Sequence, residues 1–415
     1  MAIETSTSVP QPAVVMAPDA VNRPRSQPFG ALRRRTPLGW LQLFRERSRL
    51  ATALAGIAFA DILMFMQLGF KGALYDSNTA LIKSLDADIV LVSPDAKNSQ
   101  NFSTFSRRRL YQALDIPGVS QAQALYSRPL TWTNPQTGQD TFVQILAFDP
   151  RKPALMLSGV NAQAELLKEP MVVLFDRGSR GEYDQVIAQL ERGEVVKTES
   201  EGKTLKIQGL FQLGASFGTD GFVATSDQTY SLLFPKRNPG SVSLGLLTVE
   251  PGVEVLAVRD ALAQFLTEDV EVFTKADFVQ KERNYWERES PVGFVFGLGA
   301  SMAFVVGVVI VYQVLSTDVN AHLREYATFK AMGFSQGYLL AIVVEESVIL
   351  ALLGFLPGLG VSAVLYKVAA AATTLPMVLR LDRAIFVFGL TLAMCLLSGA
   401  IATRQLQSAD PADLF

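Results

Sequence analysis

Cysteine and histidine are almost absent from this sequence. Cys395 is its single cysteine and His322 its single histidine. One cysteine excludes an intrachain disulfide, a cysteine-based zinc site and an iron–sulfur cluster. One histidine excludes a histidine-rich metal site and argues against the usual histidine-based catalytic triads. The sequence therefore predicts neither a metalloenzyme nor a hydrolase, and we expect no metal site and no catalytic residue in this chain.

Charged residues are also scarce. They make up 18% of the 415 residues, with a net charge of −2, whereas an average soluble domain has roughly 25%. Without a basic excess, the chain has no field that would attract nucleic acid. The phosphate-binding sequence GxxxxGK[ST] does not occur, so we expect that this chain binds no ATP through a P-loop.

Four long apolar runs hold most of the hydrophobic residues. They lie at residues 50–70, 291–315, 337–366 and 384–403. The first run contains one charged residue, the third contains two, and the second and fourth contain none. A helix of about 20 residues rises roughly 30 Å, the thickness of the hydrocarbon core of a bilayer. The runs therefore predict four transmembrane helices, one before and three after a long intervening block.

Basic residues near the N-terminus predict the orientation of these helices. Residues 1–49 contain 8 basic and 3 acidic residues, which places this end in the cytoplasm by the positive-inside rule. Four spans then put residues 316–336 inside, the short loop 367–383 outside and the tail 404–415 inside. We expect a multi-pass protein of the inner (plasma) membrane with both termini in the cytoplasm.

The N-terminal segment divides into two parts. Residues 1–36 are rich in Pro, Ala, Ser and Thr and have little apolar periodicity, which predicts a disordered cytoplasmic tail. Residues 37–49 combine Trp40, Leu41 and Phe44 with several arginines. This combination predicts an amphipathic helix that lies on the inner membrane surface before the first span.

The block between the first two spans, residues 71–290, has an ordinary soluble composition. It contains 23 basic and 28 acidic residues, and strand-like runs such as 142–148 and 205–213 alternate with helix-like periods. The sequence predicts a mixed α+β extracytoplasmic domain of two lobes. Helical periods at 73–85 and 277–289 lead directly from and into the spans, so we expect them to be stalk helices.

Three acidic residues lie within the apolar runs: Asp61, Glu345 and Glu346. A charge at this depth costs about 2.5–3.5 kcal/mol unless it is paired or protonated. Asp61 is compatible with a proton relay, but contact with a neighbouring helix or with water is the favoured interpretation. One of the two glutamates is expected to contact the cytoplasmic helix that precedes it.

Pairs of glycines four residues apart, Gly293 with Gly297 and Gly354 with Gly358, have the spacing that lets membrane helices approach closely. They give mild support to a homodimer.

The segment 312–334, YQVLSTDVNAHLREYATFKAMGF, resembles the cytoplasmic signature of FtsX-like permeases, the membrane subunits of MacB-type ABC transporters. The resemblance implies a short helix that docks on a separate ATPase. The residues it assigns to this coupling are Arg324, Glu325, Tyr326, Phe329, Lys330, Met332 and Gly333. Their pattern alone is equally compatible with a solvated connector helix, closed by Gly333 in a left-handed conformation.

The first span and its surroundings sharpen the resemblance. The segments Trp40–Leu43, Gly56–Ala60, Phe65–Phe70 and Leu85–Leu91 are similar to the DevC subfamily of cyanobacterial exporter permeases. The resemblance implies a non-catalytic homodimeric subunit in contact with membrane lipids and a DevA-like ATPase that binds ATP and Mg²⁺. It also implies a DevB-like membrane-fusion adaptor, a TolC-type outer-membrane duct, and export of an envelope glycolipid or another lipid-like substrate.

Three other functions fit the same architecture. One is an FtsX-like regulator of a periplasmic enzyme, another is a LolC/E-like permease that releases lipoproteins, and the third is a membrane-anchored sensor without an ATPase. An adaptor gene beside an ATPase gene would favour export, whereas a neighbouring hydrolase gene would favour regulation.

Overall fold

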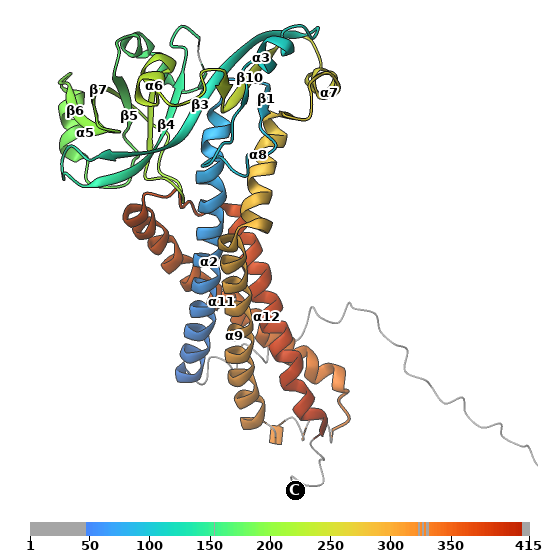
Figure 1. Ribbon diagram of the computed structural model, residues 1–415. Coiled ribbons are helices and arrows are strands. Elements are labelled where there is room, and N and C mark those ends of the chain that lie inside the picture. Colours follow the sequence, from blue (N-terminus) through green and yellow to red (C-terminus); the bar gives the residue numbers. More distant parts are fainter. Residues whose placement is uncertain (1–46, 153, 323, 326–327, 329–331, 409–415) are drawn as a thin grey trace, which may run out of the picture.

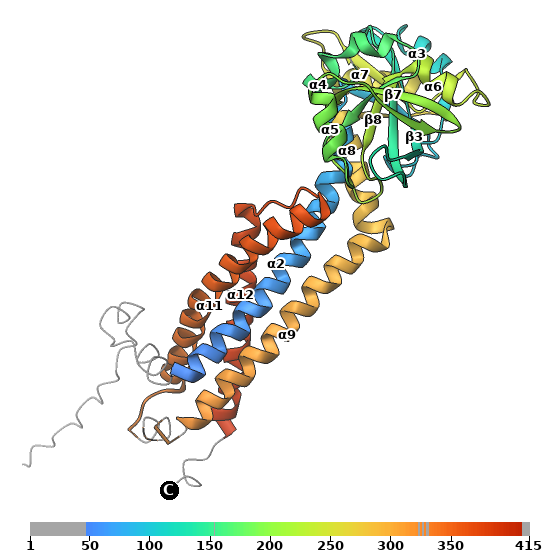
Figure 2. The same ribbon diagram turned by 90° about the vertical axis from the view of Figure 1, so that its left-hand side faces the viewer.

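A mixed sheet domain stands on one end of a bundle of long helices (Figures 1 and 2). The computed structural model describes residues 47–152, 154–322, 324–325, 328 and 332–408. The predicted tail 1–36, most of the predicted interfacial helix 37–49, and Tyr326, Phe329 and Lys330 lie outside these residues.

The bundle confirms the four predicted apolar helices. The described part of the chain contains four helices long and apolar enough to cross a membrane. They are α2 (Arg47–Ser84), α9 (Pro291–Ala321), α11 (Gln336–Thr373) and α12 (Leu381–Ser408). Helix α2 precedes the sheet domain in the chain and the other three follow it. Helix α2 packs against α9 and α11, and α12 closes the bundle against α9 and α11.

Helix α2 continues well beyond the apolar run 50–70. Its 38 residues give a length of about 57 Å at roughly 1.5 Å per residue. Residues Leu81 and Ile82 at its end are buried in the core of the sheet domain. The predicted first span and first stalk are therefore one continuous helix.

The second connection between bundle and sheet domain is segmented. Helix α8 (Lys275–Asn284) passes into a π-helix, η3 (Tyr285–Glu289), and the chain then leaves the helical conformation at Ser290. Helix α9 restarts there because the Ser290 side chain accepts a hydrogen bond from the Val292 N–H and Pro291 occupies the first turn. The predicted helix 277–289 thus consists of two pieces with different geometry.

Nine strands form one mixed sheet in the order β11-β1-β10-β3-β4-β8-β5-β7-β6. The strands are β1 (Ile89–Val92), β3 (Val119–Thr133), β4 (Asp140–Phe148), β5 (Val172–Asp176), β6 (Val196–Ser200), β7 (Lys203–Phe211), β8 (Phe222–Ser226), β10 (Leu244–Val249) and β11 (Glu271–Thr274). Neighbours are antiparallel except for the parallel pairs β4–β8 and β5–β7. A separate ribbon pairs β2 (Phe105–Ser106) with β9 (Ser241–Val242). The remaining short helices are α3 (Arg108–Ala113), α4 (Ser158–Asn161), η2 (Ala164–Lys168), α5 (Asp184–Glu191), α6 (Asp227–Leu233) and α7 (Val255–Phe265).

The long strand β3 joins the two halves of this sheet. Its first half pairs with β10, ending at Leu125 opposite Leu244. Its second half pairs with β4, starting at Tyr126 opposite Ala147. The two lobes expected from the sequence therefore share one continuous sheet.

Two separate hydrophobic cores lie within the described part of the sheet domain. One includes the packed rings of Trp132, Phe175 and Tyr183. The other includes Phe278 of α8 together with the end of α2. Both stalk helices are thus held by the same core, so a movement of either helix acts directly on the sheet.

Candidate coupling sites between the helices and the sheet domain

A buried carboxylate ties α8 to the sheet domain. Glu282 is 1% exposed. Its carboxylate accepts hydrogen bonds from the Ser99 N–H (2.9 Å), the Ser99 hydroxyl (2.7 Å) and the Trp286 indole N–H (2.8 Å). Burial raises the pKa of the Glu282 carboxyl above its ordinary value, and these hydrogen bonds oppose that shift. Two of these hydrogen bonds therefore fix the stalk to the loop around Ser99, and the third, from Trp286, joins α8 to η3 within the stalk.

The hydrogen-bonded chain continues from this loop into the sheet. The Gln144 amide donates to the Ser99 carbonyl (2.7 Å) and to the Ser127 hydroxyl (2.8 Å). On the other side, the Gln100 amide donates to the Asn78 side-chain oxygen of α2 (3.0 Å). The loop thus connects both stalk helices with strands β3 and β4.

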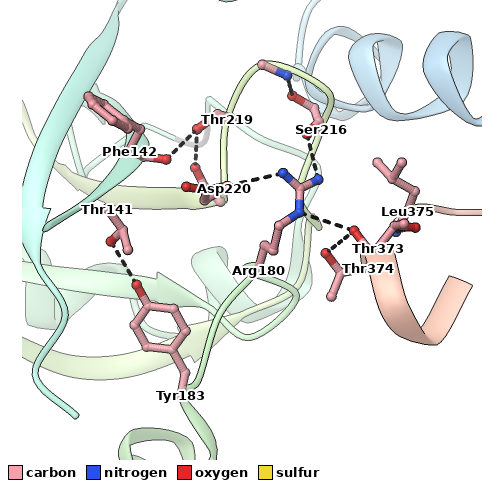
Figure 3. Close-up of polar contacts among 12 residues, drawn as sticks. Thr141, Phe142, Arg180, Tyr183, Ser216, Thr219, Asp220, Thr373, Thr374 and Leu375 are labelled. Carbon is pink, nitrogen blue, oxygen red and sulfur yellow. Dashed lines mark hydrogen bonds and ion pairs between the residues drawn. The ribbon is translucent and has the colours of Figure 1, made fainter. Parts of the chain in front are cut away.

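A second joint links the sheet domain to the end of α11 (Figure 3). The Arg180 Nε donates to the carbonyl of Thr373, the last residue of α11, at 3.2 Å. Its other two nitrogens pair with Asp220 (3.1 Å) and donate to the Ser216 carbonyl (3.1 Å). A cation is favourable at a helix C-terminus because the last carbonyls have no intrahelical donors.

An aromatic contact reinforces this joint. Phe217 packs edge-on against Phe296 of α9, with ring centroids 6.1 Å apart, and Phe296 stacks on Phe70 of α2 at 5.8 Å. Nothing in the sequence pattern singles out Arg180 or Phe217, because both lie in loops and their partners are distant in the chain. The loop 214–219 thus rests directly on the bundle.

Within the bundle, Asp61 faces α12. It is fully buried and accepts a hydrogen bond from the Thr391 hydroxyl at 2.6 Å. A Cβ added to Gly358 of α11 would lie 2.9 Å from the Asp61 Cβ. Asp61 therefore lies where α2, α11 and α12 meet.

The opposite end of the bundle carries a charged cluster. Arg49 of α2 pairs with Asp318 of α9 (3.2 Å), and His322 Nδ1 lies 3.8 Å from the same carboxylate. Glu346 of α11 is 1% exposed, and neither of its carboxylate oxygens has a hydrogen-bond partner among the described residues. Its neighbour Glu345 is only partly buried. These charges gather beside the segment to which the sequence assigned ATPase coupling.

Four of the seven predicted coupling residues are described. Arg324, Glu325, Met332 and Gly333 are all exposed. Gly333 has a φ of +88°, the left-handed conformation expected where a helix ends. The exposed segment is accessible to a partner, but the side chains of Tyr326, Phe329 and Lys330 lie outside the described residues. Within the described ranges, no group of three or more His, Cys, Asp or Glu side chains is placed to hold a metal ion.

The C-terminal part of the chain matches a known protein family. Residues 297–411 match the family model of the FtsX-like permease C-terminal domain, whereas no curated protein matches the chain significantly. One similar structure is the periplasmic region of MacB from Actinobacillus actinomycetemcomitans, at 8% identity over 49% of this chain and 96% of that chain, with a TM-score of 0.34. Another is the extracellular domain of the noncanonic ABC-type transporter YknZ from Gram-positive bacteria, at 12% identity over 45% and 99%, with a TM-score of 0.30. By this match, residues 297–411 are similar in sequence to the C-terminal domain of FtsX-like permeases.

Proposed function

We propose that this chain is the non-catalytic permease subunit of an ATP-driven exporter of the mechanotransmission type. The observation that carries the proposal is the unbroken helix α2, which runs from Arg47 through the bundle into the core of the sheet domain. A continuous helix transmits displacement over its whole length. The FtsX-like C-terminal domain supports the same function, because the coupling signature lies within it.

In this mechanism a separate ABC ATPase binds ATP and Mg²⁺ and moves the segment 316–336. The ion pair of Arg49 with Asp318 links α2 to α9 at that end. The Glu282 network and the Arg180 joint pass the motion to the sheet domain. The moving domain then drives a lipid-like or other envelope substrate towards an adaptor and an outer-membrane duct.

The remaining parts of the proposal follow the DevC-like resemblance. The subunit works as a homodimer in the inner membrane, with a DevA-like ATPase, a DevB-like adaptor and a TolC-type duct as partners. Regulation of a periplasmic enzyme, as by FtsX, and release of lipoproteins, as by LolC/E, would use the same helices with different partners. The partner that co-purifies with the sheet domain distinguishes these functions.

Changes in the coupling segment should separate the permease from its ATPase. We expect the double variant Tyr326→Ala with Phe329→Ala to leave membrane insertion and protein level intact. Loss of a buried aromatic at an interface costs about 2 kcal/mol or more, which corresponds to roughly a 30-fold weaker affinity. Co-purification of the ATPase from solubilised membranes measures this effect.

A third substitution tests the same segment, and a fourth serves as the control. Gly333→Val should also weaken ATPase association, because a β-branched residue resists the observed φ of +88°. Thr328→Ala should change nothing, since the Thr328 side chain is exposed and donates to the Arg324 carbonyl of its own segment. Full ATPase association in the double variant would contradict the coupling role.

Reporter fusions test the orientation. A reporter that is active only outside the cytoplasm should be active when fused near residue 200 and inactive when fused after Phe415. The expectation rests on the excess of basic residues in 1–49. The opposite pattern would place residues 316–336 outside the cytoplasm, where a cytoplasmic ATPase could not bind them.

A further inference from the structure

A cavity of about 410 Å³ lies between the sheet domain and the bundle, beside the Arg180 joint. Three parts of the chain line it: the outer part of α2, two loops of the sheet domain, and the connection between α11 and α12. The lining residues are Asp76, Ser77, Ala80, Arg177, Gly178, Ser179, Gln212, Leu213, Gly214, Ala215, Ala370, Thr374, Leu375 and Pro376. Figure 3 shows Thr374 and Leu375 at this joint.

The lining is polar on one side and apolar on the other. Ala370, Leu375 and Pro376, from the end of α11 and the segment after it, supply apolar surface. The sheet domain supplies polar groups, including Arg177 and Gln212. This change of polarity coincides with the end of an apolar helix, where the head groups of a bilayer would lie if α11 crosses it.

Hydrogen bonds fix the two sheet-domain loops that line the cavity. The buried Asp176 carboxylate accepts hydrogen bonds from the backbone N–H groups of Gly178 (2.9 Å), Leu213 (2.9 Å) and Gly214 (2.7 Å). These bonds hold the two sheet-domain loops together. Gly214 has a φ of +100°, and a Cβ there would meet no atom within 4 Å. The loop therefore keeps an open space beside Gly214, in a conformation that other residues adopt at a cost.

The charges on the walls have opposite signs. Asp76 on α2 is 37% exposed and Arg177 on the sheet domain is 43% exposed. Each already has a counter-ion, Lys83 at 3.9 Å and Glu191 respectively, so the surroundings are neutral overall. An anionic group would gain from Arg177 but would be repelled by Asp76 and Glu191. A group that carries both charges matches both walls.

We propose that this cavity binds the zwitterionic head group of a lipid drawn from the outer leaflet, between the sheet domain and the end of α11. The volume lies at the lower end of the roughly 300–1,000 Å³ typical of ligand sites, so it holds a head group and not the acyl chains. The chains extend along the apolar side at Ala370 and Leu375. The inference rests on the proposed function for the position and the orientation of the four helices across a membrane.

Photolabelling of the full-length protein in vesicles tests the site. The probe is a phosphatidylcholine with a diazirine on its head group, and the comparison is a phosphatidylglycerol of matched design. We expect several-fold more cross-linking by the zwitterionic probe, at peptides containing residues 212–215 and 370–376. Equal labelling by both lipids, or labelling elsewhere only, would overturn the proposal.

Variants on α11 provide the matched control. Ala370→Trp fills the cavity and should abolish the specific labelling, whereas Ala371→Trp, on the exposed neighbouring position, should retain it. Asp76→Asn should reduce the preference for phosphatidylcholine over phosphatidylglycerol at least several-fold. An unchanged preference would remove the charge argument and with it the proposal.

Two outcomes separate this inference from the proposed function. If soluble glycerophosphocholine competes as strongly as the lipid, the ligand comes from solution and the lipid proposal is wrong. If the site is unlabelled while the topology reporters and ATPase association behave as expected, the lipid site is rejected and the permease function stands.

Discussion

Exchange of Gly358 for leucine is expected to disrupt the helix bundle. A Cβ on Gly358 would lie 2.9 Å from the Asp61 Cβ and 3.3 Å from the backbone of Ala58. The backbone of α2 cannot yield as a flexible side chain can, so α2 and α11 must separate. Overpacking of this kind typically costs about 1–3 kcal/mol, and the branched leucine side chain should reach at least the upper end. The fraction of monodisperse protein in detergent after stepwise heating measures the loss.

Gly360 offers a control on the same helix. A Cβ there meets no atom within 4 Å, so Gly360→Leu should keep the thermal profile of the unchanged protein. Equal behaviour of the two variants would contradict the packing of α11 on α2. The same geometry revises the interpretation of the spaced glycines, because Gly354 and Gly358 contact α2 of their own chain, at Ile57 and Asp61. Their spacing therefore gives no separate support for a homodimer.

Removal of the Glu282 carboxylate should release the stalk from the sheet domain. In Glu282→Ala, the Ser99 N–H and the Trp286 N–H lose their acceptor, whereas the Ser99 hydroxyl can still donate to the Asn78 carbonyl at 3.2 Å. An unsatisfied buried donor costs about 1–3 kcal/mol, so the local opening free energy of this loop should fall by several kcal/mol. Hydrogen exchange at the Ser99 amide should accelerate by at least 100-fold, which corresponds to about 2.7 kcal/mol.

The conservative variant distinguishes lost contacts from general damage. Glu282→Gln keeps an acceptor oxygen and a similar volume, so exchange at Ser99 should accelerate much less than in Glu282→Ala. Exchange in the distant strand β6 should be unchanged in both. If Ser99 exchanged at its original rate in Glu282→Ala, the network would not hold the loop.

The sequence predicts the apolar helices well because their signal is local. Long uncharged runs have few alternatives to a membrane helix, and all four runs correspond to α2, α9, α11 and α12. Composition marks the lipid-facing stretch, however, and not the end of the helix. The change to polar composition after Phe70 therefore suggested a boundary, whereas α2 continues to Ser84.

Long-range contacts explain what the sequence does not predict. Strand β3 lacks a clear alternation because the polar residues Gln123 and Ser127 are buried, and the Ser127 hydroxyl accepts a hydrogen bond from Gln144. The strand also contains Pro129, which cannot donate to the ladder. Arg180 bonds to a carbonyl 193 residues away. Neither feature has a local pattern, since each depends on atoms brought together only by the complete fold.

The two chain connections between the bundle and the sheet domain differ in continuity, and in the proposed mechanism this difference would decide the direction in which the sheet domain moves. Helix α2 acts as a rigid strut, whereas the π-helix and the break at Ser290 form a pivot between α8 and α9. A sheet domain carried by one continuous helix and one interrupted helix, and held beside them by the Arg180 joint, would respond to unequal displacement by tilting, not by rising. A small axial slip of α9 against α2 would thus swing the far edge of the sheet through an arc, with the largest travel at the strands farthest from α2.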